Sequence, residues 1–187
     1  MSLEEWLKTV SDFERREDWR GLELHCQAKL EADPSYVHAL FPLGLALFKQ
    51  GNLFGAMPVL GKSAREAPTP QAWFTLAHAR HKVGNTKLAI EAMLKAVDLD
   101  PTSHEPWNDL GTLLTAANDY KAALNAFNTA HNLAPTNIQT LKNIGFLYAL
   151  SNYPEGVALV REKIQAISYA EAEAFAKDAT NAMKKTT

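Results

Sequence analysis

The sequence predicts an all-α fold, an α-solenoid of about five helix-turn-helix repeats. Three observations predict it. A set of apolar and small residues recurs every 33 or 34 residues, turn-forming residues separate the recurrences, and the apolar residues of each copy have helical spacing. Because one helical hairpin cannot bury its apolar face alone, the copies are expected to stack into one array.

The clearest copy covers residues 104–137. Its first predicted helix carries apolar residues three and four apart on one face, with a glycine that lets a second helix approach closely: Trp107, Leu110, Gly111 and Leu114. We expect Trp107 to be a large buried aromatic. On the second helix, Phe127 is the large residue between small alanines. Pro135 ends the pair, because proline cannot easily continue a helix.

Steps of 33 or 34 residues locate the other copies. The predicted repeats cover residues 3–36, 37–69, 70–103, 104–137 and 138–167. A final helix over residues 168–185, with Ser168 as its N-cap, is expected to cover the open apolar face of the last repeat. Gly51 and Gly84 follow a predicted first helix, where a left-handed residue is favoured. We expect residues 1–187 to form a single domain.

This pattern resembles the tetratricopeptide repeat, whose signature places Trp, Leu-Gly, Tyr, Ala, Phe and Pro at fixed offsets. Leu114 takes the position of the Tyr. The resemblance implies a right-handed superhelix in which the first helices line a concave groove. It also implies a non-catalytic scaffold or adaptor that binds a segment of a partner protein in that groove.

The groove positions of the family, carried over residue by residue, supply the candidate partner-binding residues. They are Arg15, Phe41, Leu45, Phe48, Lys49, Phe74, His78, His81, Lys82, Asn108, Lys142, Asn143 and Phe146. Asn143 resembles the asparagines with which other members hold a peptide backbone. The same positions also hold Glu4, Leu7, Ser11 and Glu14 in the first repeat, His38 in the second, Thr112, Thr115 and Ala116 in the fourth, and Leu150 in the fifth.

Two groups stand out among these candidates. The apolar patch consists of Phe41, Leu45, Phe48 and Phe74, which would be exposed in an empty groove. The basic row consists of Arg15, Lys49 and Lys82, which occupy the same position in three successive repeats. The partner would therefore offer apolar anchors and an acidic flank.

Other functions remain open at this stage. The chain could be a chaperone that shields an apolar segment of a client, as bacterial secretion chaperones with such repeats do, or a self-associating assembly protein. No catalytic motif is recognisable, so neither an enzyme nor a cofactor is expected. His78 and His81 could share a metal ion, but no third ligand is evident and no metal site is predicted.

Composition restricts the classes of partner and the cellular compartment that are expected. A formal net charge of −2 gives no field that would attract nucleic acid or an anionic membrane. The lone cysteine, Cys26, occupies a core position and is predicted to be a small buried hydrophobe without a redox role. The acidic N-terminus does not resemble a secretory signal, and no apolar run approaches the ~18 residues of a membrane span. We expect a cytoplasmic protein.

Two prolines conflict with the helical pattern. Pro42 and Pro58 lie inside the predicted helices 37–50 and 53–66. An interior proline costs about 3 kcal/mol relative to alanine, and kinks are expected at both positions.

Overall fold

The computed structural model describes residues 2–186, with side chains up to residue 184. Residues 1 and 187, the ends of the predicted domain, lie outside the described part. The described residues form eleven α-helices and one short 3-10 helix, and they contain no strand. The predicted all-α class is confirmed.

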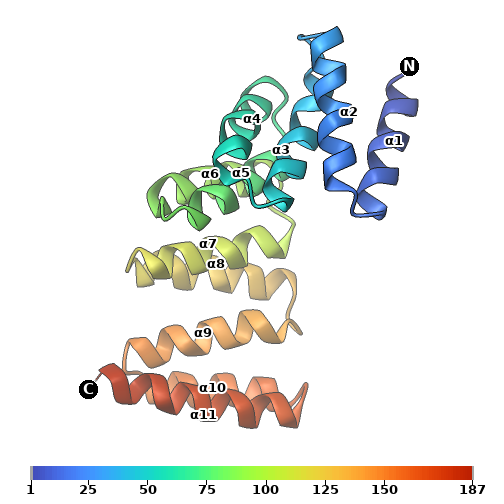
Figure 1. The fold of residues 1–187 in the computed structure, drawn as a ribbon. Coiled ribbons are helices and arrows are strands. Elements are labelled where there is room, and N and C mark those ends of the chain that lie inside the picture. The colour runs from blue at the N-terminus through green and yellow to red at the C-terminus, as the bar shows by residue number, and fades with distance from the viewer. Residues whose placement is uncertain (1, 187) are drawn as a thin grey trace. The chain divides into compact units, whose positions relative to one another are not determined.

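Contacts divide the chain into two compact units, unit 1 (Met1–Leu99) and unit 2 (Asp100–Thr187). Unit 1 contains α1 (Leu3–Arg15), α2 (Trp19–Ala32), η1 (Val37–Ala39), α3 (Leu40–Lys49), α4 (Leu53–Glu66), α5 (Pro70–Lys82) and α6 (Thr86–Leu99). Unit 2 contains α7 (His104–Ala116), α8 (Tyr120–Leu133), α9 (Ile138–Leu150), α10 (Pro154–Gln165) and α11 (Tyr169–Thr186). Within each unit, successive helices pair into antiparallel hairpins (Figure 1).

Each hairpin turn contains one residue in the left-handed region. The φ angles there are 53° at Glu17, 80° at Gly51, 82° at Gly84, 62° at Asn118 and 49° at Asn152. The next N–H then reaches back to a carbonyl of the first helix, as in the 2.9 Å bond from Asn52 N to Leu47 O. The predicted left-handed conformation of Gly51 and Gly84 is confirmed.

Side-chain caps fix the start of the second helices. Asp18, Asn52 and Asp119 stand directly before α2, α4 and α8. Their Oδ1 atoms accept hydrogen bonds from the backbone N–H groups three residues on, at 2.8, 3.0 and 3.1 Å. These bonds satisfy N–H groups that lack a partner within the helix. The hairpin register is therefore set by short polar side chains at one position of the repeat.

Close approach of the two helices depends on a glycine in the first. A Cβ atom at Gly111 would lie 2.5 Å from Cδ1 of Phe127, and one at Gly44 would lie 2.6 Å from Cδ2 of Leu60. Phe127 is 2% exposed and Leu60 is fully buried. The expected close approach of the second helix at Gly111 is confirmed; the structure adds that Phe127 is the residue packed there, and the second repeat uses the same arrangement.

This packing gives opposite expectations for two glycine-to-alanine changes. Gly111→Ala is expected to destabilise the protein by about 1–3 kcal/mol, because the new methyl group forces the buried Phe127 ring to move. Gly61→Ala meets only the mobile end of Arg65, at 3.3 Å, and is expected to be neutral or to stabilise by up to about 1 kcal/mol. Urea unfolding of both variants measures the difference. Equal effects would contradict the assigned contact.

The final helix covers the fifth repeat, as predicted. Ser168 Oγ accepts a 3.4 Å hydrogen bond from Glu171 N at the start of α11. Phe175, 1% exposed, belongs to the same buried cluster as Ile144 of α9 and Val160 of α10. Its ring lies against Gly145, where a Cβ atom would overlap it. Gly145 thus performs for α11 the role that Gly111 performs for α8.

Two expectations about single residues are wrong. Trp107 is half-buried, because its indole Nε1 donates a 3.0 Å hydrogen bond to the surface carbonyl of Pro101. Pro42 does not interrupt a helix, because α3 begins only at Leu40, after the 3-10 turn, and Pro42 lies in its first turn. N–H groups there lack helical partners in any case. Pro58 does lie inside its helix, α4.

Candidate functional site

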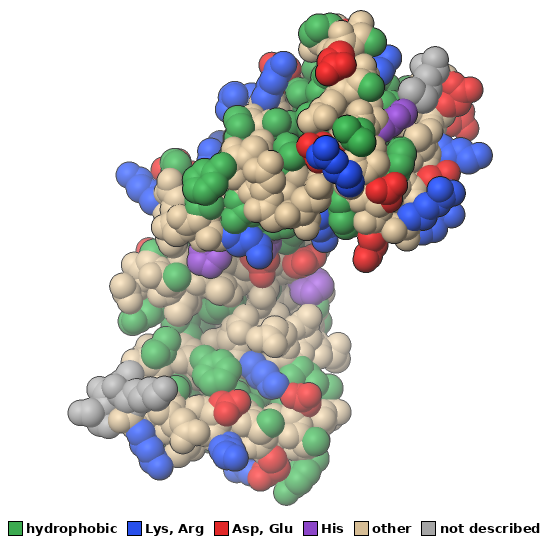
Figure 2. All heavy atoms as spheres, in the orientation of Figure 1, with side chains coloured by type: hydrophobic (Ala, Val, Ile, Leu, Met, Phe, Trp, Pro, Cys, Tyr) green, Lys and Arg blue, Asp and Glu red, His purple; other side chains and the backbone are tan. Residues whose placement is uncertain are grey.

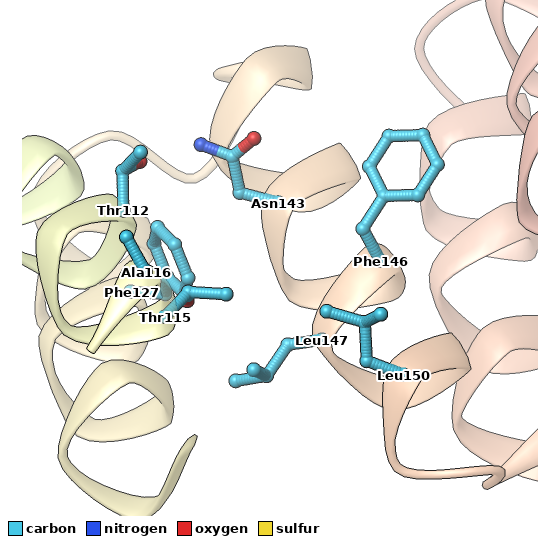
Figure 3. A pocket seen from close by; sticks show the side chains of 8 residues that line it. All are labelled: Thr112, Thr115, Ala116, Phe127, Asn143, Phe146, Leu147 and Leu150. Atoms are coloured by element: carbon cyan, nitrogen blue, oxygen red, sulfur yellow. The ribbon is translucent and has the colours of Figure 1, made fainter. Parts of the chain in front are cut away.

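Unit 2 has a pocket of ≈280 Å³ between α7 and α9, the first helices of two successive repeats. We call it the α7–α9 pocket. Its lining residues are Thr112, Thr115, Ala116, Phe127, Asn143, Phe146, Leu147 and Leu150. Figure 3 shows the α7 side chains facing Asn143 and Leu147 of α9 across an open space. The pocket therefore lies on the predicted inner face.

The threonine hydroxyls do not make this pocket strongly polar. Thr112 Oγ1 donates to Asn108 O at 3.2 Å, and Thr115 Oγ1 donates to Gly111 O at 2.8 Å. Because each hydroxyl hydrogen is used within its own helix, the methyl groups and the aliphatic side chains dominate the lining. An apolar side chain of a partner fits such a surface.

Two asparagines lie between this pocket and a more polar one. Asn143 Nδ2 donates to Asn108 Oδ1 at 3.0 Å, and Asn143 Oδ1 accepts from Gln139 Nε2 at 3.0 Å. The polar pocket, also ≈280 Å³, is lined by His104, Glu105, Asn108, Asp109, Asn137, Gln139 and Thr140. An amide has two N–H donors and two lone pairs, so both asparagines retain hydrogen-bonding capacity for a ligand.

The two other candidates in unit 2 contact the final helix. Lys142 Nζ lies 2.6 Å from Glu171 Oε2 of α11. The Phe146 ring meets Phe175 edge to face, with centroids 5.6 Å apart. Lys142 thus pairs with a carboxylate of its own chain, and Phe146 supports α11 as well as lining the pocket.

In unit 1, the apolar patch is half-buried rather than exposed. This holds for all four members, Phe41, Leu45, Phe48 and Phe74. The Phe74 ring lies edge-on to His78, with centroids 4.5 Å apart. Only part of each side chain in the patch is therefore accessible to a partner.

The basic row lies at the C-terminal ends of α1, α3 and α5, and all three side chains are exposed. Lys49 Nζ is 5.6 Å from the centroid of Trp19, and Lys82 Nζ is 5.8 Å from that of Phe48. Each lysine thus reaches an aromatic ring of the preceding repeat. Arg15 pairs with Asp12 one turn earlier. His81 is exposed beside Lys82.

Unit 1 has a pocket of ≈340 Å³, which we call the α1–α3 pocket. Of the residues that line it, only Phe41 is among the candidate partner-binding residues. Its lining residues are Leu7, Val10, Ser11, Glu14, Val37, His38, Phe41, Pro42, Ser63, Ala67 and Thr69. Burial raises the pKa of the Glu14 carboxyl above its ordinary value. The sequence did contain a sign of this pocket, because Leu7, Ser11 and Glu14 occupy groove positions of the first repeat.

Several other features bear on the possible chemistry. Cys26 is fully buried, and burial together with the charge of Glu14 raises the pKa of its thiol to about 12, as expected for an inert core residue. Within residues 2–184, no three His, Cys, Asp or Glu side chains are grouped to hold a metal ion.

None of the described helices is long and apolar enough to cross a bilayer. On the face in Figure 2, acidic and basic side chains are interspersed in both units.

Known proteins resemble this chain in sequence. A family model of the tetratricopeptide repeat (TPR) matches residues 70–103. The chain is 31% identical over 136 residues to the Protein CTR9 homolog of Arabidopsis thaliana. That match spans 65% of this chain but only 12% of the much longer relative.

Solved structures resemble it in fold. MamA matches with a TM-score of 0.80 at 20% identity, over 92% of this chain and 98% of its own. MamA from Desulfovibrio magneticus RS-1 gives 0.80 at 17%, over 89% and 95%. YrrB, described as a TPR protein with an unusual peptide-binding site, gives 0.79 at 19%, over 90% and 88%. With the family-model match over residues 70–103, the recurring signature and these structural matches, the chain has the fold of tetratricopeptide repeat proteins.

Proposed function

We propose that this chain is a non-catalytic protein-binding module that holds a segment of a partner against the inner faces of its first helices. The observation that carries the proposal is the α7–α9 pocket. Inner-face residues of two successive repeats surround one apolar space there, with an asparagine pair at its edge. Such a surface suits a peptide that inserts an apolar side chain and offers its backbone to the amides.

One protein of similar fold supports this proposal. YrrB, which has a similar fold, is described as having a peptide-binding site. In unit 1, the exposed cations Lys49 and Lys82 would favour an acidic flank on the partner. We therefore propose a scaffold or adaptor whose partner has an apolar anchor beside acidic residues.

The pocket can be blocked without disturbing the core. Thr112 is exposed and lines the α7–α9 pocket, so Thr112→Trp is expected to fill the space and lower partner affinity about tenfold or more. Asn128→Trp, at an exposed position of α8 outside both pockets of unit 2, is the matched control. Partner capture from the native cell, followed by titration of the purified partner, measures the effect.

The identity of the captured protein separates the alternatives. One stoichiometric partner, lost with Thr112→Trp and retained with Asn128→Trp, supports the adaptor. Many unfolded clients would indicate a chaperone, and a second copy of the chain would indicate self-association. Unchanged binding by the blocked variant, with helicity preserved, would show that the partner uses another surface.

A further inference from the structure

The α1–α3 pocket of unit 1 combines apolar walls with one carboxylate. Leu7 and Val10 of α1 and Phe41 of α3 supply apolar surface, and Glu14 lies on the last turn of α1. Neither lysine nor arginine is among the described residues that line it. At ≈340 Å³, the cavity is within the range of about 300–1,000 Å³ that is usual for ligand pockets.

Glu14 is the unusual group of this pocket. Its side chain is half-buried, and no hydrogen bond or ion pair joins its carboxylate to another described residue. Burying a carboxylate without a partner costs free energy, and the raised pKa of Glu14 reflects that cost. A cation that entered the pocket would offset the cost, because a charge-assisted hydrogen bond would replace part of the lost hydration.

The nearby charges leave this carboxylate available. Arg15, the next residue, pairs with Asp12 of the same helix rather than with Glu14. Burial, and after it the negative charge of Glu14, raise the pKa of the Cys26 thiol, so this neighbour supplies no positive charge to the carboxylate. No described lysine or arginine thus occupies the position that a ligand would take, and His38 is the basic residue among those that line the pocket.

We propose that the α1–α3 pocket binds a basic side chain, arginine or lysine, of a partner protein. The methylene stem would lie against Leu7, Val10 and Phe41, and the charged end would meet Glu14. Long basic side chains combine an apolar stem with a polar end, which matches this lining. The proposal rests on the proposed protein-binding function. It adds a positively charged partner residue at this pocket, in contrast to the acidic partner residues expected at the basic row.

A matched pair of probes tests the pocket directly. N-acetyl-arginine N-methylamide carries the cation, and N-acetyl-citrulline N-methylamide has nearly the same shape without the charge. Each is titrated into the 187-residue chain while backbone amide shifts are followed by NMR. The arginine probe is expected to shift the amides of Ser11, Glu14, Phe41 and Thr69 saturably, and to bind about tenfold more tightly than the citrulline probe.

Three variants locate the effect. Glu14→Gln is expected to lower the affinity for the arginine probe about tenfold and to leave the citrulline probe unaffected. Glu31→Gln, which removes an exposed carboxylate of α2 outside the pocket, is expected to change neither affinity. Ser11→Trp, at an exposed position on the pocket wall, is expected to abolish binding of both probes. Circular dichroism confirms that each variant is folded.

Two outcomes would overturn the assignment. Equal affinity for the two probes would show that the pocket recognises only the apolar stem. Full affinity of Glu14→Gln for the arginine probe would show that another group accepts the cation. Neither result bears on the α7–α9 pocket, whose test uses unit 2 and a whole partner. The two proposals can therefore fail separately.

Discussion

Replacing Phe175 by alanine is expected to lower the free energy of unfolding of unit 2 by about 3–5 kcal/mol. The ring is 1% exposed, and it occupies the space that Gly145 leaves on α9. It also meets Phe146 edge to face. Removing it opens a cavity where α11 packs on α9 and α10, so α11 should detach before the other helices unfold.

Hydrogen exchange and urea unfolding measure this effect. Protection should fall first in α11 and then in α9 and α10, which share its buried cluster. Lys177→Ala, at an exposed position of the same helix, is the control and is expected to change stability by less than about 0.5 kcal/mol. A loss of protection confined to α11, with unchanged stability of α9, would show that the helix is an appendage and not a cap.

The sequence predicted the helices well, because the same information is repeated in every hairpin. Apolar spacing located each helix, and turn residues located the ends to within a few residues. The left-handed residues Glu17, Asn118 and Asn152 could not be predicted in the same way. Glycine adopts that conformation without a steric cost and therefore indicates it, whereas these residues carry a Cβ atom that disfavours it. The hairpin geometry imposes it on whichever residue occupies the turn.

For the candidate site, the sequence could predict only which positions of each repeat face inward. Inner-face positions do meet around pockets, as Thr112 with Asn143 and Ser11 with Phe41 show. Their availability was not predictable, because it depends on contacts between distant segments. Lys142 pairs with Glu171, and Phe146 packs on Phe175, only because α11 folds back over α9. A pattern internal to one repeat contains no information about that contact.

The same limit applies to the tryptophan position of the repeats, which is occupied by Trp6 in the first repeat, Trp73 in the third and Trp107 in the fourth. Trp6 and Trp107 differ most plainly in their burial. Trp6 is fully buried, stacked on His25 with centroids 4.8 Å apart and edge-on to Tyr36 at 5.3 Å. Trp107 is half-buried at the surface. The signature treats these two residues as equivalent, and the packing does not.

Trp6→Ala is therefore expected to cost more than Trp107→Ala. The first change should lower the free energy of unfolding by about 3–5 kcal/mol, because it empties a closed site. The second should cost about 1.5–3 kcal/mol, since it removes half the buried area and one hydrogen bond. Chemical denaturation of both variants, followed by circular dichroism, measures the difference.

Trp6→Phe shows whether ring packing is the cause. It keeps an aromatic ring beside His25 and Tyr36, and it removes an indole N–H that has no acceptor among the described residues. Because a buried donor without an acceptor is itself unfavourable, Trp6→Phe should recover most of the stability that Trp6→Ala loses. A loss as large as that of Trp6→Ala would mean that the size of the indole matters more than its stacking. If Trp107→Ala lowered the free energy of unfolding more than Trp6→Ala did, burial of the tryptophan would not be what determines its contribution to stability.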